Sequence, residues 1–226
     1  MNLTNMLESI ALTLISTMII IGVISSYISP ETYYWLYAED RLAEWIDFYS
    51  FLIAGLFFIW RFFHIYQNKN AHKVSKYSLL LCGILLIFFA GEEISWGQRI
   101  IGFESSTFFK QYHCHQYTNF HCLYLGGFLG IGNTGDWFNV SMNFISILYL
   151  IILPIVLKYS QKAENFINCT YLPTPKTNHS VVFTFLFILT CISKITIWDN
   201  SEPLQVIATF IFCLVTINPK NKHIYK

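Results

Sequence analysis

The sequence predicts an all-α integral membrane protein, a bundle of about six transmembrane helices. Both termini are expected inside, with one long outer loop at residues 98–139. Two observations carry this prediction. Of the 226 residues, 54% are hydrophobic and only 12% are charged, with a mean hydropathy of +0.48, which is typical of polytopic membrane proteins. The apolar residues also form long runs separated by polar loops, so we expect one transmembrane domain over residues 1–226.

Each apolar run comes close to the length that a helix needs to cross a hydrocarbon core of about 30 Å, at about 1.5 Å per residue. The first run follows a segment without Lys or Arg and without a clear cleavage site, so we interpret it as an uncleaved anchor rather than a signal peptide. We expect the spans at residues 10–28, 45–66, 77–97, 140–157, 181–198 and 204–217.

The charged residues predict the orientation. Most basic residues fall after the second run, after the fourth run and in the C-terminal tail: Arg61, Lys69, Lys73, Lys76, Lys158, Lys162, Lys176, Lys220, Lys222 and Lys226. Most acids fall on the other side: Glu31, Glu39, Asp40, Glu44, Asp47, Glu92, Glu93, Glu104, Asp136, Asp199 and Glu202. The positive-inside tendency then places both termini inside. No long basic tract is present, so we expect membrane lipids as partners and no nucleic acid.

Two adjacent acids, Glu92 and Glu93, close the third apolar run. In a helix that begins near Tyr77 they would lie about 23 Å along its axis, inside the membrane or at its edge. An acid at mid-membrane costs about 2.5–3.5 kcal/mol, and an intramembrane acid therefore indicates a functional site.

A continuous helix would place Glu92, Ser95, Trp96 and Arg99 on one face, at i, i+3, i+4 and i+7. Glu93 would point elsewhere. One acid can then pair with Arg99, while the other needs a different partner. The alternative is that a Glu–Arg pair only locks helix packing.

Carboxylates of three spans are expected at the same depth: Asp40, Glu44 and Asp47 of the second, Glu92 and Glu93 of the third, and Glu202 of the sixth. Like charges at one place raise each other's pKa or require a cation. The internal counter-ions are Arg41, Arg99 and Lys194. A divalent metal is the other solution, because mixed carboxylate and imidazole ligation suits zinc, manganese or iron. The candidate metal ligands are Glu44, Glu92, Glu93 and His121.

The long loop holds three histidines, His113, His115 and His121, and two cysteines, Cys114 and Cys122. Their spacing matches no standard zinc finger. The cysteines can form a disulfide, stay free or bind metal, and all three remain open. We favour His121 for a functional role, because Asn119 precedes it by two residues and can orient it. Phenylalanines at 103, 108 and 109 predict a short interfacial helix.

Residues 91–104 read Gly-Glu-Glu-Ile-Ser-Trp-Gly-Gln-Arg-Ile-Ile-Gly-Phe-Glu. This stretch resembles the signature of a group of uncharacterised bacterial polytopic membrane proteins. The group also shows an acidic Glu-Asp-x-x-x-Glu-Trp segment before an earlier span, here residues 39–45, and an Asn-x-His pair, here Asn119 and His121. Thr118 and Cys122 depart from the Glu and Asn that usually flank this pair. The resemblance covers residues 39–122 and implies a shared site without naming its chemistry.

A weaker resemblance is to intramembrane zinc hydrolases of the alkaline ceramidase type. The leading hypothesis is therefore a membrane-embedded, metal-dependent hydrolase or transferase that acts on a lipid or lipid-linked substrate. Glu92 or Glu93 would be general base or metal ligand, Arg99 and Gln98 would bind a phosphate or carbonyl oxygen, and His121 would be ligand or acid. The alternatives are an ion- or proton-coupled transporter and a non-catalytic assembly or signalling subunit. In each case we expect a multi-pass protein of the bacterial inner membrane.

Overall fold

The computed structural model describes residues 3–38, 41–67, 73–113, 116–120, 123, 134–194 and 202–225, and only the backbone of residues 134–139 and 194. In this part the chain is helical and forms no strand, as the sequence predicted. The elements in order are α1 (Leu3–Ile28), α2 (Pro30–Tyr37), α3 (Leu42–Tyr66), α4 (Lys73–Glu93), η1 (Ser95–Gly97), α5 (Gln98–Ile101), α6 (Thr107–Tyr112), α8 (Thr134–Ile147), η2 (Leu148–Ile152), α9 (Leu153–Tyr159), α10 (Gln161–Thr170), α11 (Thr177–Lys194), α12 (Glu202–Ile217) and η3 (Lys222–Tyr225).

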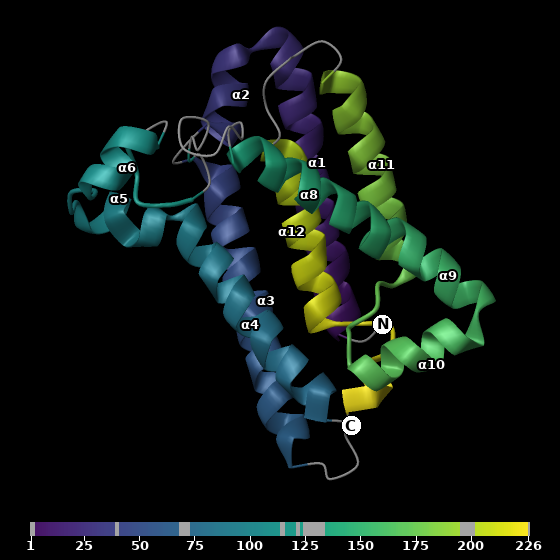
Figure 1. Ribbon diagram of the computed structural model, residues 1–226. Helices are drawn as coiled ribbons and strands as arrows, with labels where there is room; N and C mark the ends of the chain where they lie inside the picture. The colour runs from purple at the N-terminus through teal and green to yellow at the C-terminus, as the bar shows by residue number, and fades with distance from the viewer. Residues whose placement is uncertain are drawn as a thin grey trace.

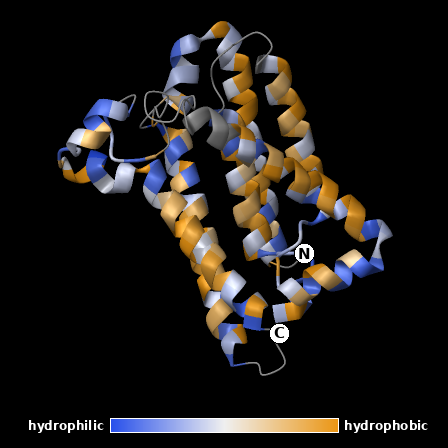
Figure 2. Ribbon diagram, viewed as in Figure 1, coloured by the Kyte–Doolittle hydropathy of each residue, from blue (hydrophilic) through white to orange (hydrophobic). Residues whose placement is uncertain are grey.

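Four helical segments are long and apolar enough to cross a membrane: α1, the α2–α3 segment, α4 and residues 140–159. Two more apolar helices, α11 and α12, are shorter. This is the pattern of a multi-pass membrane protein, while the predicted total of six spans stays a prediction. Both termini lie at the same end of the bundle (Figure 1). Apolar residues dominate the long helices and polar residues gather at the ends and in the connections (Figure 2).

Helix α12 is the central helix of the bundle. It packs against α1, α3, α8 and α11, and Val206, Ile207, Ile211 and Val215 on it are fully buried. A helix that is apolar on all sides belongs inside a bundle. The polar side chains of Gln205, Thr209 and Thr216 on α12 are therefore buried within the protein.

Helices α3 and α4 form the closest pair, and two glycines allow the close approach (Figure 1). A Cβ atom on Gly83 would lie 2.7 Å from Cγ1 of Ile59 and 3.0 Å from the carbonyl oxygen of Gly55. Small residues at such contacts let two backbones pack directly in a membrane. The pair holds the start of α3 beside the end of α4.

The helix of residues 134–159 contains a π-helical turn, η2, directly before Pro154. Proline has no N–H to donate to the preceding turn, and a π-turn is one way for a helix to absorb that loss. The irregular turn therefore lies where proline removes a backbone donor.

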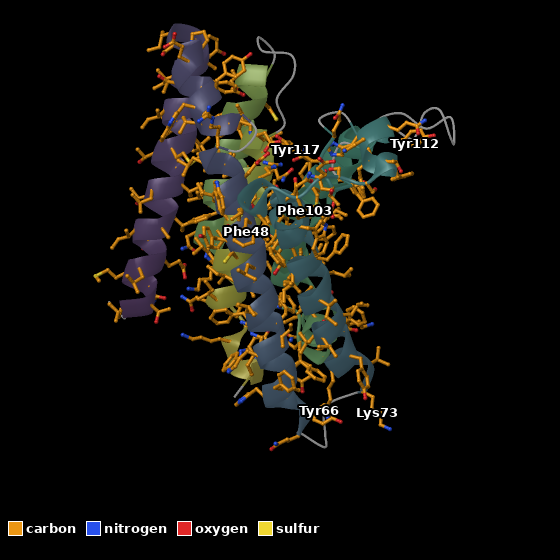
Figure 3. The ribbon with its side chains drawn as sticks, turned by 90° about the vertical axis from the view of Figure 1, so that its left-hand side faces the viewer. Phe48, Tyr66, Lys73, Phe103, Tyr112 and Tyr117 are labelled. Atoms are coloured by element: carbon orange, nitrogen blue, oxygen red, sulfur yellow. The ribbon has the colours of Figure 1, made fainter. Side chains whose placement is uncertain are left out.

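We call the end of the bundle that carries α2, the start of α3 and the end of α4 the acidic end, and the opposite end the terminal end. Tyr117 lies towards the acidic end, and Tyr66 and Lys73 lie at the terminal end (Figure 3). At the terminal end the ring of Tyr225 lies 4.0 Å from the guanidinium of Arg61, and its hydroxyl donates to the carbonyl of Tyr171 at 2.7 Å. Burial raises the pKa of Tyr225 to about 12.

Candidate functional site

Helix α4 ends at Glu93, four residues before the predicted end. Ser95, Trp96 and Gly97 all have positive φ, at 48°, 55° and 79°, so the chain turns away from the helix axis. The prediction that residues 92–99 continue one helical face is therefore wrong. Trp96 nevertheless folds back over α4, because Gly91 has no side chain where the indole ring lies.

Glu92 anchors the segment that follows α4. Its Oε1 accepts a hydrogen bond from Nε1 of Trp96 at 2.6 Å, and its Oε2 accepts one from the backbone N–H of Phe120 at 2.5 Å. The side chain is buried. Hydrogen bonds to a charged acceptor are stronger than neutral ones, so Glu92 ties residue 120 to the end of α4.

Asn119 also holds this segment against the end of α4. Its Nδ2 donates to the hydroxyl of Ser95 at 2.9 Å and to the carbonyl of Glu92 at 3.4 Å, and its Oδ1 contacts Nε2 of buried His113. The sequence had assigned Asn119 to orient His121, which lies outside the described residues. The histidine that Asn119 contacts in the described residues is His113.

Gln98 holds the same segment from its other side. Its Nε2 donates to Ser105 at 2.8 Å, and its Oε1 accepts from the backbone N–H of Thr118 at 2.7 Å. Both ends of the amide are therefore engaged within the protein. The first bond joins α5 to Ser105, and the second joins it to Thr118.

Arg99 forms its ion pair with Glu44 of α3, at 2.5 Å between NH1 and Oε2. The pairing with Glu92 that a continuous helix would have allowed is not formed, because α4 ends before Arg99 and Glu92 accepts from Trp96 and Phe120. The guanidinium also donates to Ser95 at 3.1 Å and lies 4.6 Å from the ring centre of Tyr117.

Glu93 points into the bundle, away from Glu92. Its Oε1 accepts from Nε2 of Gln205 in α12 at 2.9 Å, and only 6% of the residue is exposed. Three other carboxylates lie close enough for their charges to act on it: Asp47, Glu202 and Glu44. Of the acids that the sequence placed at one depth, Glu93 thus has Glu44, Asp47 and Glu202 as neighbours. Glu92 faces Trp96 and Phe120 instead, and Asp40 lies outside the described residues.

Asp47 of α3 is the most deeply buried of these acids, with 0% of the residue exposed. Its Oδ1 accepts a hydrogen bond from the hydroxyl of Thr209 in α12. Its Oδ2 and the Oε1 of Gln205 have no hydrogen-bond partner in the described part of the chain. Buried oxygens without partners are rare in native proteins and call for an explanation such as a bound ion or water.

Gln205 and Thr209 were not predicted as site residues, because the sequence prediction was based on charged residues. They lie four residues apart, on one face of the most buried helix. The sequence feature that could have identified them is an amide and a hydroxyl side chain four residues apart in an uncharged apolar run. We call Asp47, Glu93, Gln205 and Thr209 the buried acidic site.

A small pocket adjoins this site and is lined by Glu44, Glu93 and Arg99 together with Trp45, Ile94 and Ile100. Its volume is about 20 Å³, which is room for a single water molecule. A lipid headgroup does not fit there.

The predicted metal ligands Glu44, Glu92 and Glu93 do not converge on one point: Glu92 bonds Trp96 and Phe120, while Glu93 faces Gln205. In the residues that the structure describes, no three His, Cys, Asp or Glu side chains are arranged to hold a metal ion. His121, His115, Cys114 and Cys122 lie outside those residues, as do Glu39 and Asp40.

On the exposed surface of the segment that follows α5, Nζ of Lys110 lies 2.7 Å from Oε2 of Glu104. This hydrogen bond holds the pKa of Glu104 below its ordinary value. Glu104 itself is exposed, so the pair is a surface ion pair of little energetic weight.

A second buried polar cluster lies at the terminal end and was not predicted. Glu8 of α1 accepts from Lys176 at 2.7 Å, from Asn178 at 2.9 Å and from Asn218 at 2.5 Å. Nε2 of His179 lies 3.1 Å from Glu8, without hydrogen-bond alignment. The cluster ties α1, α11 and the end of α12 together.

The helices and the buried acidic site together describe a multi-pass membrane protein with interacting acids among three packed helices. No family model, curated protein or solved structure matches the chain. The resemblance stated from the sequence therefore stays a prediction.

Proposed function

We propose that this chain is a multi-pass protein of the bacterial inner membrane whose buried acidic site binds a proton or a monovalent cation, as in an ion- or proton-coupled carrier. The observation that supports it is a pair of buried acceptor oxygens beside Glu93, Oδ2 of Asp47 and Oε1 of Gln205, which have no hydrogen-bond partner among the described residues. Two carboxylates in a low-dielectric place repel each other unless a positive charge lies between them. A proton or a cation supplies that charge.

The lipid hydrolase or transferase hypothesis fits this geometry less well. It requires Arg99 and Gln98 to contact a substrate, but Arg99 is engaged with Glu44, Ser95 and Tyr117, and Gln98 is engaged with Ser105 and Thr118. It also requires space beside Glu93, where the pocket has room for only one water molecule. In our proposal four residues are positioning residues that hold the chain in place at the acidic end: Glu92, Gln98, Arg99 and Glu44.

Orientation with both termini inside places the site towards the outer face of the membrane. The site would then load its ion from the outer side. The common position of the termini in the structure agrees with an even number of crossings (Figure 1).

Ion flux into proteoliposomes tests this function. Under an imposed proton or sodium gradient, we expect liposomes with the wild-type protein to show a flux above that of empty liposomes. Asp47→Asn and Glu93→Gln keep the shape of the side chains and should abolish the flux, while the matched change of an exposed acid, Glu104→Gln, should leave it unchanged. Absence of flux under both gradients, or full flux in both site variants, contradicts the proposal.

A further inference from the structure

A groove of about 570 Å³ lies on the surface of the bundle, between the η2–α9 segment and α11, and its lining residues are not those of the buried acidic site. This volume is in the range of small-molecule sites. The groove opens sideways, where the surrounding surface is apolar: Ile155, Val181, Phe185 and Ile188 are all more than half exposed. An open apolar groove on such a surface faces lipid tails.

The lining of the groove changes from polar to apolar along its length. Lys158, at the end of α9, and Thr177 and Ser180, in the first turn of α11, line one part, whereas Phe185 and Ile188 line the other. The chain returns from α9 to α11 through α10 at the terminal end, so the polar residues of both walls lie together (Figure 1). From Thr177 to Ile188 the groove extends about 16 Å.

Lys158 has the surroundings of a headgroup ligand. It is exposed, and in the described part of the chain its ammonium contacts the ring of Tyr159, 5.6 Å away, without a carboxylate partner. Tyr159, the last residue of α9, and Phe166, in the middle of α10, are 79% and 68% exposed. Exposed aromatic residues beside lysine are typical of the membrane–water interface. Lys158 therefore lies at the depth of lipid phosphates.

We propose that this groove binds an anionic phospholipid. The ammonium of Lys158 and the hydroxyl of Thr177 would bind the headgroup phosphate, and an acyl chain would lie along Ile155, Val181 and Phe185. Charge complementarity selects the lipid: the groove offers a cation and hydroxyl groups at its polar end and no acidic side chain. The π-turn before Pro154 shapes one wall of the groove. This proposal is independent of the buried acidic site.

Native mass spectrometry of the detergent-purified protein tests it, with phosphatidylglycerol and phosphatidylcholine of identical acyl chains as probes. We expect the wild-type protein to retain phosphatidylglycerol several-fold more than phosphatidylcholine. Lys158→Gln should bring this ratio close to one and Lys158→Glu should invert it, whereas Lys162→Gln, a matched change on α10, should leave it unaltered. Thr184→Phe, which fills the groove, should reduce retention of both lipids.

Equal retention of the two lipids by the wild type overturns the proposal, as does an unchanged ratio in Lys158→Gln. If Thr184→Phe does not fold, Val181→Trp, on an exposed position of the same wall, serves as the filling variant. An excess of inorganic phosphate should leave phosphatidylglycerol bound. Its displacement would mean that the groove takes a free phosphate ion and would overturn the lipid assignment.

Discussion

Gln205 of α12 donates a hydrogen bond of 2.9 Å to Glu93 at the end of α4, across 112 positions of the chain. The bond fixes the direction of Glu93 into the bundle and leaves Oε1 of Gln205 beside Asp47 without a partner in the described residues. Glu92, one residue earlier, faces the opposite way and holds the segment at residue 120. The two adjacent acids thus have separate structural roles.

These separate roles predict different phenotypes for Glu92→Gln and Glu93→Gln. Glu92→Gln removes the charged acceptor of the Phe120 N–H, a bond of about 1.5–3 kcal/mol, so exchange of that amide with deuterium should become about tenfold faster or more. Gln98→Leu removes the acceptor of the Thr118 N–H, so exchange of the Thr118 amide should also become faster. Glu93→Gln should leave both amides as slow as in the wild type. Equal exchange rates in Glu92→Gln and the wild type would refute the anchoring role.

The ion pair between Glu44 and Arg99 should behave as a partly buried structural pair. Its side chains are 14% and 13% exposed, respectively. Removing one partner leaves an uncompensated charge, so Glu44→Gln or Arg99→Gln alone should lower the free energy of unfolding by about 3 kcal/mol. The double variant should recover most of that loss, as measured by denaturant titration in detergent. Additive losses in the double variant would show that the two residues act independently.

The α3–α4 contact predicts a penalty for adding a single carbon atom. Gly83→Ala places a Cβ atom 3.0 Å from the carbonyl oxygen of Gly55, and backbone atoms cannot move away without separating the helices. We expect a loss of about 1–3 kcal/mol from overpacking, partly offset by the better helix propensity of alanine. Leu81→Ala, on the exposed side of the same helix, is the control and should change stability little. A Gly83→Ala variant as stable as the wild type would contradict the close packing.

The orientation predicts which engineered cysteines react from outside. A membrane-impermeant thiol reagent should label a cysteine placed at Ser106, which is exposed, and should not label one placed at Asn70, in a background with the native cysteines replaced. The reverse pattern would place the buried acidic site towards the inner face.

The sequence predicted the long apolar helices well, because hydropathy and the need to satisfy backbone hydrogen bonds in lipid act over whole segments. It also predicted that acids of three runs meet. The sequence prediction was wrong at residues 94–97. Helix α4 ends there at three consecutive residues with positive φ, and no proline in this stretch indicates the helix end. The roles of the Gln205 amide and of the polar cluster at Glu8 were not predicted from the sequence. They depend on which helices pack together, and hydropathy does not contain that information.

Carbodiimide labelling of the carboxyl groups tests whether the buried acidic site binds a proton or a cation, because a hydrophobic carbodiimide reacts with a protonated carboxyl group inside a membrane. We expect a covalent adduct on Asp47 or Glu93, located by mass spectrometry of peptides, that decreases when the pH is raised or when sodium ions compete for the site. Glu104, exposed and paired with Lys110, should remain unlabelled. Absence of an adduct on both Asp47 and Glu93, or an adduct that neither pH nor sodium alters, would contradict a proton- or cation-binding site.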